Sequence, residues 1–272
     1  MCKDSKSLWS KLRCLLQPAA DKTSTYQHSA EEFAQHFHNK VSAIRASTAN
    51  APSPSIVDRV VPEPLSVFEP VTAAEVSSIL VKSPAKHCVL DPIPTWLLKK
   101  VSTVLSPVIA RMCNASISQS SLPSSQKCAR TRPLLKKPSL DPSNLNSYRP
   151  ISNLTFISKT LERLIDARFT KHADKHSLFP VNQSAYRKYH STETAVVRIY
   201  NDLINAVDLG HVGALVLLDL SSAFDTVDHQ VMLNVLHQRF GVCDAALTGS
   251  RHTSMDEHKF SHLHQKCPQC DR

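Results

Sequence analysis

The sequence predicts an α/β chain that is rich in helices and contains few strands. Apolar residues recur at intervals of three and four along several segments, as on one face of an α-helix, and residues 29–45 are the first example. Residues 212–218 are instead apolar on successive positions, which is typical of a strand covered on both faces. From Ser47 to Pro70 the chain is rich in proline and small polar residues, so we expect a linker there.

The first helices are expected to begin at capping boxes. Ser29 and Thr72 are each followed three residues later by a glutamate, whose side chain can accept a hydrogen bond from the backbone of the cap residue. After the turn DPIP at 91–94 we expect a longer helix. Pro107 should kink this helix, because proline lacks the N–H that an interior helical position donates.

The second half of the chain is expected to contain three helices and two short strands. In order, these elements are a strand at 131–137, a turn at 141–147, a helix carrying Leu161, Leu164 and Phe169, a helix from a Ser191 cap to Gly210, the strand 212–218, and a helix carrying Val231 and Phe240 that ends at Gly241.

Composition indicates a folded chain inside the cell. The 272 residues are 42% hydrophobic, which is enough to build a core. No apolar run could cross a bilayer and residues 1–16 do not resemble a signal peptide, so we expect a nuclear or cytoplasmic protein with no membrane partner. The cysteines should then be reduced thiols. Six of them lack metal-ligand spacing and are expected to fill small apolar spaces: Cys2, Cys14, Cys88, Cys113, Cys128 and Cys243.

Positive charge is concentrated in the middle of the chain. The formal charge is +9, and no acidic residue lies between Pro92 and Leu140. Such a segment should attract a phosphate backbone, although an ordinary solvated basic surface is the alternative. The candidates for binding nucleic acid are Lys127, Arg130, Arg132, Lys136 and Lys137.

One carboxylate, Asp219, follows the apolar run directly in the segment LVLLDLSSAFD at 215–225. Burial disfavours the charged form of a carboxylate, so a group in this position usually has a positive partner, often a metal. Magnesium takes such oxygen ligands and shares its coordination shell with substrate phosphates. The simpler alternative is that Asp219 caps the turn after a core strand.

Three stretches, in this order and at these spacings, resemble the reverse transcriptase of non-LTR (LINE-type) retrotransposons. They are LLKKPSLDPSNLNSYRPISNLTFISKTLERLI at 134–165, FPVNQSAYRKYHSTETA at 179–195 and LVLLDLSSAFDTVDH at 215–229. The resemblance runs from about Val61 to Gly241 and implies a right-hand polymerase fold, with fingers and a partial palm on an incomplete antiparallel sheet. It divides the chain into an upstream helical region with its Pro-rich linker (1–60), fingers and partial palm (61–242), and an unrelated tail (243–272).

The resemblance also implies partners and roles. The family carries out RNA-directed DNA synthesis with Mg²⁺, an RNA template, a DNA primer and deoxynucleoside triphosphates. Asp219 matches its catalytic metal ligand, and the carbonyl of Leu220 would lie beside the same ion. Phe224 matches the aromatic wall of the sugar pocket, although a core position would also suit it. Arg149 and Arg187 match basic finger residues that contact nucleotide or template. Three neighbouring aromatic residues suit either base stacking or core packing: Tyr148, Tyr186 and Tyr189.

The chain departs from the family pattern in ways that bear on activity. It contains no Asp-Asp dipeptide, which the family carries in a later motif, and the resemblance is expected to stop after Gly241, before that motif and the thumb. Ala185 stands where the family commonly has glycine. We therefore expect a polymerase fragment that is inactive alone; the alternatives are a nucleic-acid-binding remnant without chemistry and a relic without function. The strand 212–218 would also lack its neighbours, which predicts a partly molten or poorly soluble chain.

The tail from residue 243 has a different composition, with spaced histidines before Cys267 and Cys270. Two thiolates and two imidazoles could bind zinc. Because the spacing from His264 to Cys267 is tight for a folded finger, the preferred interpretation is unrelated sequence joined to a broken retroelement.

Overall fold

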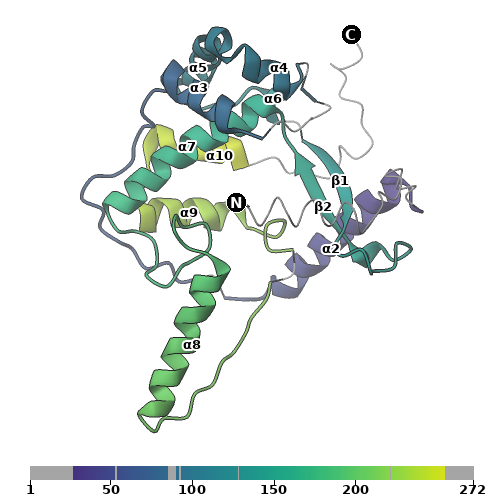
Figure 1. Cartoon of the computed structure of the whole chain (residues 1–272), viewed down its shortest axis with the longest axis vertical. Coiled ribbons are helices and arrows are strands. Elements are labelled where there is room, and N and C mark those ends of the chain that lie inside the picture. The colour runs from purple at the N-terminus through teal and green to yellow at the C-terminus, as the bar shows by residue number, and fades with distance from the viewer. Residues whose placement is uncertain are drawn as a thin grey trace, which may run out of the picture.

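The computed structural model describes residues 27–52, 54–84, 90–91, 93–127, 129–220 and 222–254. Helices dominate the described part, and its sheet has two antiparallel strands, so the expected helix-rich α/β character is confirmed (Figure 1). The elements are α2 (Ala30–Thr48), α3 (Ala73–Lys82), α4 (Thr95–Lys100), α5 (Ser102–Ser118), α6 (Ser124–Lys127), β1 (Arg130–Leu135), η1 (Leu145–Ser147), β2 (Tyr148–Asn153), α7 (Phe156–Lys175), α8 (Thr192–Asp208), α9 (His229–Phe240) and α10 (Asp244–Ser254).

The ends of the helices follow local sequence signals. Ser29 and Thr72 both form the predicted capping boxes, and Ser191 caps α8 in the same way with Thr194 in place of glutamate. Gly210 follows α8 with φ +75°, and Gly241 caps α9 with φ +64°. Both glycines adopt the left-handed conformation that side chains with a Cβ atom rarely take, which explains why the helices end there.

The helix expected around Pro107 is divided, but not at the proline. Val101 (φ −102°, ψ 18°) separates α4 from α5, and α5 continues through Pro107. The expected kink is therefore replaced by a break six residues earlier, at Val101. Three elements were not expected: the short helix α6, β2, which contains Pro150, and α10, which lies in the segment assigned to the tail.

The expected strand at 212–218 is wrong. These residues have no regular secondary structure, and Val212 and Leu218 are 98% and 89% exposed. A strand is stable only when a neighbour satisfies its backbone N–H and C=O groups. No described residue pairs with this segment, so its apolar composition does not make it a strand here.

The body of the molecule is built on α3, α5 and α7. Their apolar faces meet in a core that includes Val76, Leu80, Ile109 and Leu164, each at most 4% exposed. A second cluster joins Phe68 of the linker to Val242 and Ala246, which flank the start of α10. The boundary expected after Val242 therefore falls inside a packed cluster, although the origin of residues 243–272 stays a prediction.

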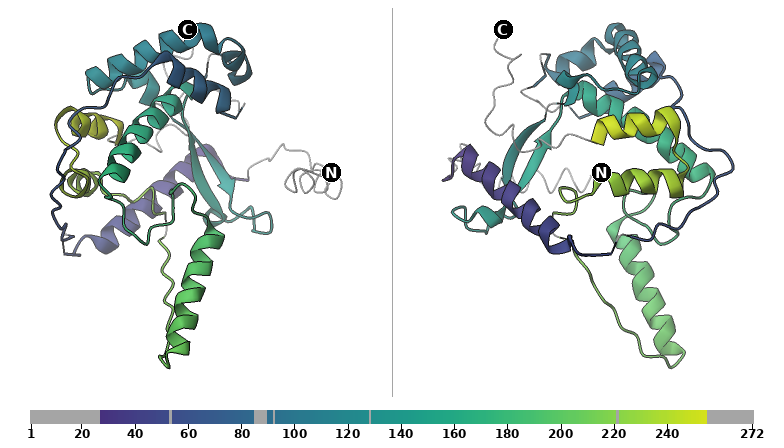
Figure 2. Two further views of the ribbon diagram at one scale, coloured as in Figure 1. Left: turned by 60° about the vertical axis from the view of Figure 1, so that its left-hand side comes forward. Right: turned by 180° about the vertical axis from the view of Figure 1, so that it is seen from behind.

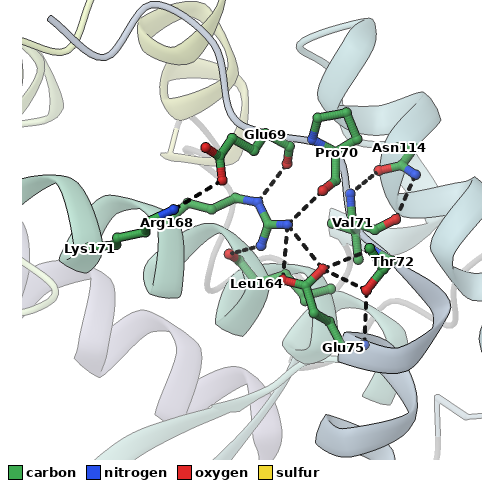
Figure 3. A network of polar contacts seen from close by, with 9 residues as sticks. All are labelled: Glu69, Pro70, Val71, Thr72, Glu75, Asn114, Leu164, Arg168 and Lys171. Atoms are coloured by element: carbon green, nitrogen blue, oxygen red, sulfur yellow. Dashed lines mark hydrogen bonds and ion pairs between the residues drawn. The ribbon is translucent and has the colours of Figure 1, made fainter. Parts of the chain in front are cut away.

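The linker is fastened to the body by one buried arginine, Arg168 of α7 (Figure 3). Its guanidinium donates to the backbone carbonyls of Glu69 (2.6 Å), Pro70 (2.8 Å) and Leu164 (3.1 Å). The same group lies 3.3 Å from the carboxylate of Glu75, which belongs to the capping box of α3. A single side chain thus joins α7, the linker and the start of α3.

One part of the chain projects away from this body. Figures 1 and 2 show α8 pointing outward, with the following segment returning beside it. We call residues 192–220 the α8 arm. None of the side chains in α8 is buried, and every residue from 211 to 220 is exposed. The arm therefore adds nothing to the core described above.

Candidate nucleic-acid interface

Two of the basic residues predicted to bind nucleic acid, Arg130 and Arg132, lie on the two-stranded ribbon formed by β1 and β2. In its antiparallel register Arg130 lies opposite Asn153, Arg132 opposite Ile151 and Leu134 opposite Arg149. Successive residues of a strand point to opposite faces, so these six residues share one face. The ribbon therefore brings Arg130, Arg132 and Arg149 together, although Arg149 lies well apart from the other two in the sequence.

This face is open to solvent. All three arginines are exposed, and Leu134 and Ile151 between them are 46% and 37% exposed. Guanidinium groups bind phosphate oxygens in a bidentate manner, and exposed aliphatic side chains beside them can contact bases or sugars. The arrangement is a basic, partly apolar strip along a ribbon.

The opposite face of the ribbon is held by α2. The ring of Tyr148 lies edge-on to Phe33 with 4.9 Å between centroids, and Phe37 completes this cluster. The Tyr148 hydroxyl donates to the carbonyl of Pro142 at 3.1 Å. Tyr148 is therefore a core residue and is not available for stacking on bases, whereas its packing fixes the direction in which Arg149 points.

Lysines extend the positive charge beyond the end of β1. Lys136 and Lys137 are exposed, and Lys136 Nζ donates to the carbonyl of Asn146 at 2.8 Å. Partial burial, followed by the positive charges of Lys40 and Lys136, lowers the pKa of His36 on the neighbouring helix α2. Lys127 ends α6 and is half-buried, so it is a weaker candidate for contact with a large ligand.

Asp219 is not part of this ribbon and lies on the exposed return segment of the α8 arm. The prediction of a buried carboxylate at the end of a strand is therefore wrong, and so is the alternative of a cap after a core strand, because there is no such strand. Leu220 beside it is 77% exposed. In the described part of the chain Asp219 forms no ion pair with Arg149 or Arg187.

The other nucleotide-binding candidates lie at the base of the arm. Arg187 Nη1 donates to Asp174 Oδ1 of α7 at 2.8 Å, and its guanidinium stacks 4.2 Å from the ring centroid of Phe179. Phe224 is 74% exposed and meets Tyr186 edge-on with 6.5 Å between centroids. Phe224 and Tyr186 are thus neither core residues nor part of the basic ribbon. Tyr189 is exposed as well.

The residues present do not fit the magnesium that the resemblance implies. Magnesium prefers six oxygen ligands in near-octahedral geometry, several of them waters, and two-metal catalysis needs several carboxylates. Among the described residues no group of three or more His, Cys, Asp or Glu side chains is placed to hold a metal ion. Asp219 and the carbonyl of Leu220 would therefore have to hold the ion without such a group. The cysteines and most histidines considered for zinc lie outside the described residues.

Within the described ranges, no helix combines the length and the apolar character that crossing a membrane requires.

Comparisons with known proteins give one consistent result. The family described as "Reverse transcriptase (RNA-dependent DNA polymerase)" matches residues 135–269, which extends past Gly241. A probable RNA-directed DNA polymerase from transposon BS of Drosophila melanogaster is 25% identical over 231 residues, covering 84% of this chain and 25% of that protein. The corresponding protein of the X-element from the same organism is 30% identical over 195 residues, covering 69% and 21%.

A third similar protein is the RNA-directed DNA polymerase from mobile element jockey of Drosophila funebris. It is 26% identical over 224 residues, covering 79% of this chain and 24% of that protein. The chain thus spans about a quarter of the length of these relatives.

Proposed function

Because the chain carries a reverse transcriptase domain related to the polymerases of non-LTR retrotransposons, we propose that it is a nucleic-acid-binding part of such an enzyme, without polymerase activity of its own. In this proposal the exposed face of the β1–β2 ribbon binds the phosphate backbone of RNA or of an RNA–DNA duplex. Arg130, Arg132 and Arg149 make the contacts, and Lys136 and Lys137 extend them.

The observation that carries the proposal is the convergence of the three arginines on a supported ribbon. The arginines come from two strands, yet their common face is free of carboxylates, while the reverse face packs on α2 through Tyr148. A ribbon held in this way presents its guanidinium groups without having to order the backbone first, which lowers the entropic cost of binding.

The proposed lack of activity rests on the absence of a metal-binding cluster in the described part of the chain. Phosphoryl transfer between nucleotides needs metal ions held by several oxygen ligands, and no group of three or more His, Cys, Asp or Glu side chains among the described residues, Asp219 included, is placed to hold one. Arg187 and Phe224 remain nucleotide-binding candidates by resemblance, at the base of the arm.

A filter-binding titration against single-stranded RNA at two salt concentrations tests the binding proposal. We expect retention that falls with salt, so that log K plotted against log salt has a negative slope. A triple variant with Arg130→Ala, Arg132→Ala and Arg149→Ala should make this slope shallower by about 2. The matched control removes three exposed arginines outside the ribbon and the α8 arm, at Arg45, Arg59 and Arg239, and so has the same net charge. Equal losses in both variants would show that only net charge matters, and no salt-sensitive retention would favour a relic without function.

A primer-extension assay with homopolymer template, primer, deoxynucleotides and magnesium tests the second half of the proposal. We expect no incorporation above background. Incorporation that Asp219→Ala abolishes would show that the chain is an active polymerase and would overturn this part.

A further inference from the structure

The α8 arm carries a large share of the exposed apolar side chains in the described part of the chain. Thirteen of its large apolar side chains, between Val196 and Leu220, are at least 40% exposed. Contiguous patches of this kind on a soluble protein usually mark an interaction site. The arm makes no contribution to the nucleic-acid-binding ribbon, so its apolar character needs a separate explanation.

The helix and the return segment of the arm expose complementary features. On α8 the uncovered residues Val197, Tyr200, Ile204 and Val207 recur at intervals of three, four and three, which is the seam of a coiled coil. Leu203 lies on the side that the return segment covers, because a Cβ atom added at Gly213 would be 3.0 Å from Cδ2 of Leu203. The return segment thus covers one side of α8 and leaves the seam open.

The return segment also has unused backbone groups. From Val212 to Leu220 no backbone hydrogen bond with another described residue is formed, and the side chains are apolar except at Asp219. Such a segment can act as an edge strand that pairs with another chain. Identical segments pair antiparallel around a two-fold axis, because each contact then occurs twice.

From these features we propose that the α8 arm is a self-association surface, through which two copies of this chain form a symmetric dimer. The two return segments pair as antiparallel strands and the two α8 seams pack over them.

The available area is sufficient for a second copy. Burying a Val, Leu or Ile side chain is worth about 1.5–3 kcal/mol at about 25 cal/mol per Å², which corresponds to about 60–120 Å² for each. The twelve Val, Leu and Ile side chains among the thirteen offer on the order of 1,000 Å² per copy, whereas a stable interface needs about 800 Å² per partner.

Charge gives this interface a salt dependence opposite to that of nucleic-acid binding. Residues 192–220 contain Glu193, Asp202, Asp208 and Asp219 against one arginine, Arg198, so each arm has a net charge of −3 with His211 neutral. The arms repel each other and salt screens this repulsion, as it screens the overall repulsion between two copies at +9. We therefore expect salt to strengthen the dimer and to weaken the binding of RNA.

Sedimentation velocity over a hundredfold range of protein concentration, in reducing buffer so that cysteines cannot cross-link, tests the dimer. We expect a monomer–dimer equilibrium that tightens with salt. Val212→Lys in the return segment and Val197→Lys in α8 should each weaken dimerisation about tenfold or more, because a charge would have to be buried.

Each variant has a matched control with an exposed valine outside the arm. Val60→Lys replaces a residue that is 94% exposed in the linker, and Val104→Lys replaces one that is 74% exposed on α5. Both controls should dimerise as the parent chain does. A monomer at all concentrations, an equal effect of the controls, or dimerisation that persists in both arm variants would overturn the proposal. Since the ribbon variants leave the arm intact, failure of RNA binding and failure of dimerisation can be told apart.

Discussion

The α3–α5–α7 body and the α8 arm are built from similar helices but differ in what surrounds them. In the body, Val76 and Leu80 of α3 are fully buried against neighbouring helices, and Arg168 fastens the linker across them. In the arm, α8 has a capping box like that of α3 and an amphipathic pattern, yet none of its side chains is buried. The comparison shows that a capped amphipathic sequence is enough to specify a helix, whereas burial depends on a partner element.

This difference has a thermodynamic consequence. Most of the stability of a helix in a protein comes from packing of its apolar face, because a short helix alone is marginal in water. The packed core of the body replaces the expectation of a partly molten chain: we expect the body to unfold as one cooperative unit, and the arm of a monomer to unfold separately with little enthalpy.

The largest expected effect is loss of a buried leucine from the body. Leu80→Ala should lower the free energy of unfolding by about 2–5 kcal/mol, since it removes transfer energy and leaves a cavity among packed helices. Leu217→Ala in the arm should change it by no more than about 0.5 kcal/mol, because Leu217 is 81% exposed. Calorimetry on dilute, monomeric protein would measure both. Comparable losses would mean that the arm packs on the body in solution.

The elements that could be predicted from the sequence are those set by local interactions. Ser29, Thr72 and Ser191 bond to backbone only three residues away, and Gly241 needs no distant partner to adopt its left-handed conformation. The strand expected at 212–218 failed for the opposite reason. Its apolar composition was recognised correctly, but a strand is defined by its neighbour, and a local pattern does not reveal whether one exists.

The candidate site was predicted in the same uneven way. The basic residues of β1 could be identified from the absence of acidic residues around them. That Arg149 joins them could not, because this follows from the pairing of Leu134 with Arg149 and β2 contains Pro150, which argues against a strand. For Asp219 the motif identified the residue as a candidate. The exposure of its side chain depends on tertiary packing, which a local motif does not reveal.

A smaller effect is expected at the glycines that end α8 and α9. In Gly241→Ala the new Cβ atom would lie 2.8 Å from Cβ of Val61, in addition to the cost of a positive φ. We expect a loss of about 1–3 kcal/mol from the body, measured by denaturant unfolding.

Gly210 is the matched position in the arm. It also has a positive φ, but nothing lies within 4 Å of an added Cβ atom. Gly210→Ala should fray the end of α8 without moving the cooperative transition. If Gly210→Ala were the more destabilising of the two, the arm and not the linker contact at Val61 would govern stability.

The smallest effect concerns acid stability and Glu75. The backbone N–H of Thr72, its hydroxyl and the guanidinium of Arg168 lower the pKa of Glu75 from the ordinary value of 4.5. A carboxyl with a lowered pKa stabilises the fold fully above its unfolded-state pKa, and this contribution is lost as pH falls through the folded-state pKa. The body should therefore lose stability as the pH drops below about 4.5, by less than about 1 kcal/mol from this residue because its side chain is 45% exposed. Glu75→Gln, which can still form the capping box, should remove that part of the pH dependence.

Glu193 is the matched residue in the arm. Hydrogen bonding to Ser191 likewise lowers the pKa of Glu193. Glu193→Gln should nevertheless leave the acid dependence of the cooperative melt unchanged, since α8 is not part of the unit that melts. Melting temperatures of the three proteins between pH 3 and pH 7 would decide this, and a larger change for Glu193→Gln than for Glu75→Gln would contradict the division into a cooperative body and an independent arm.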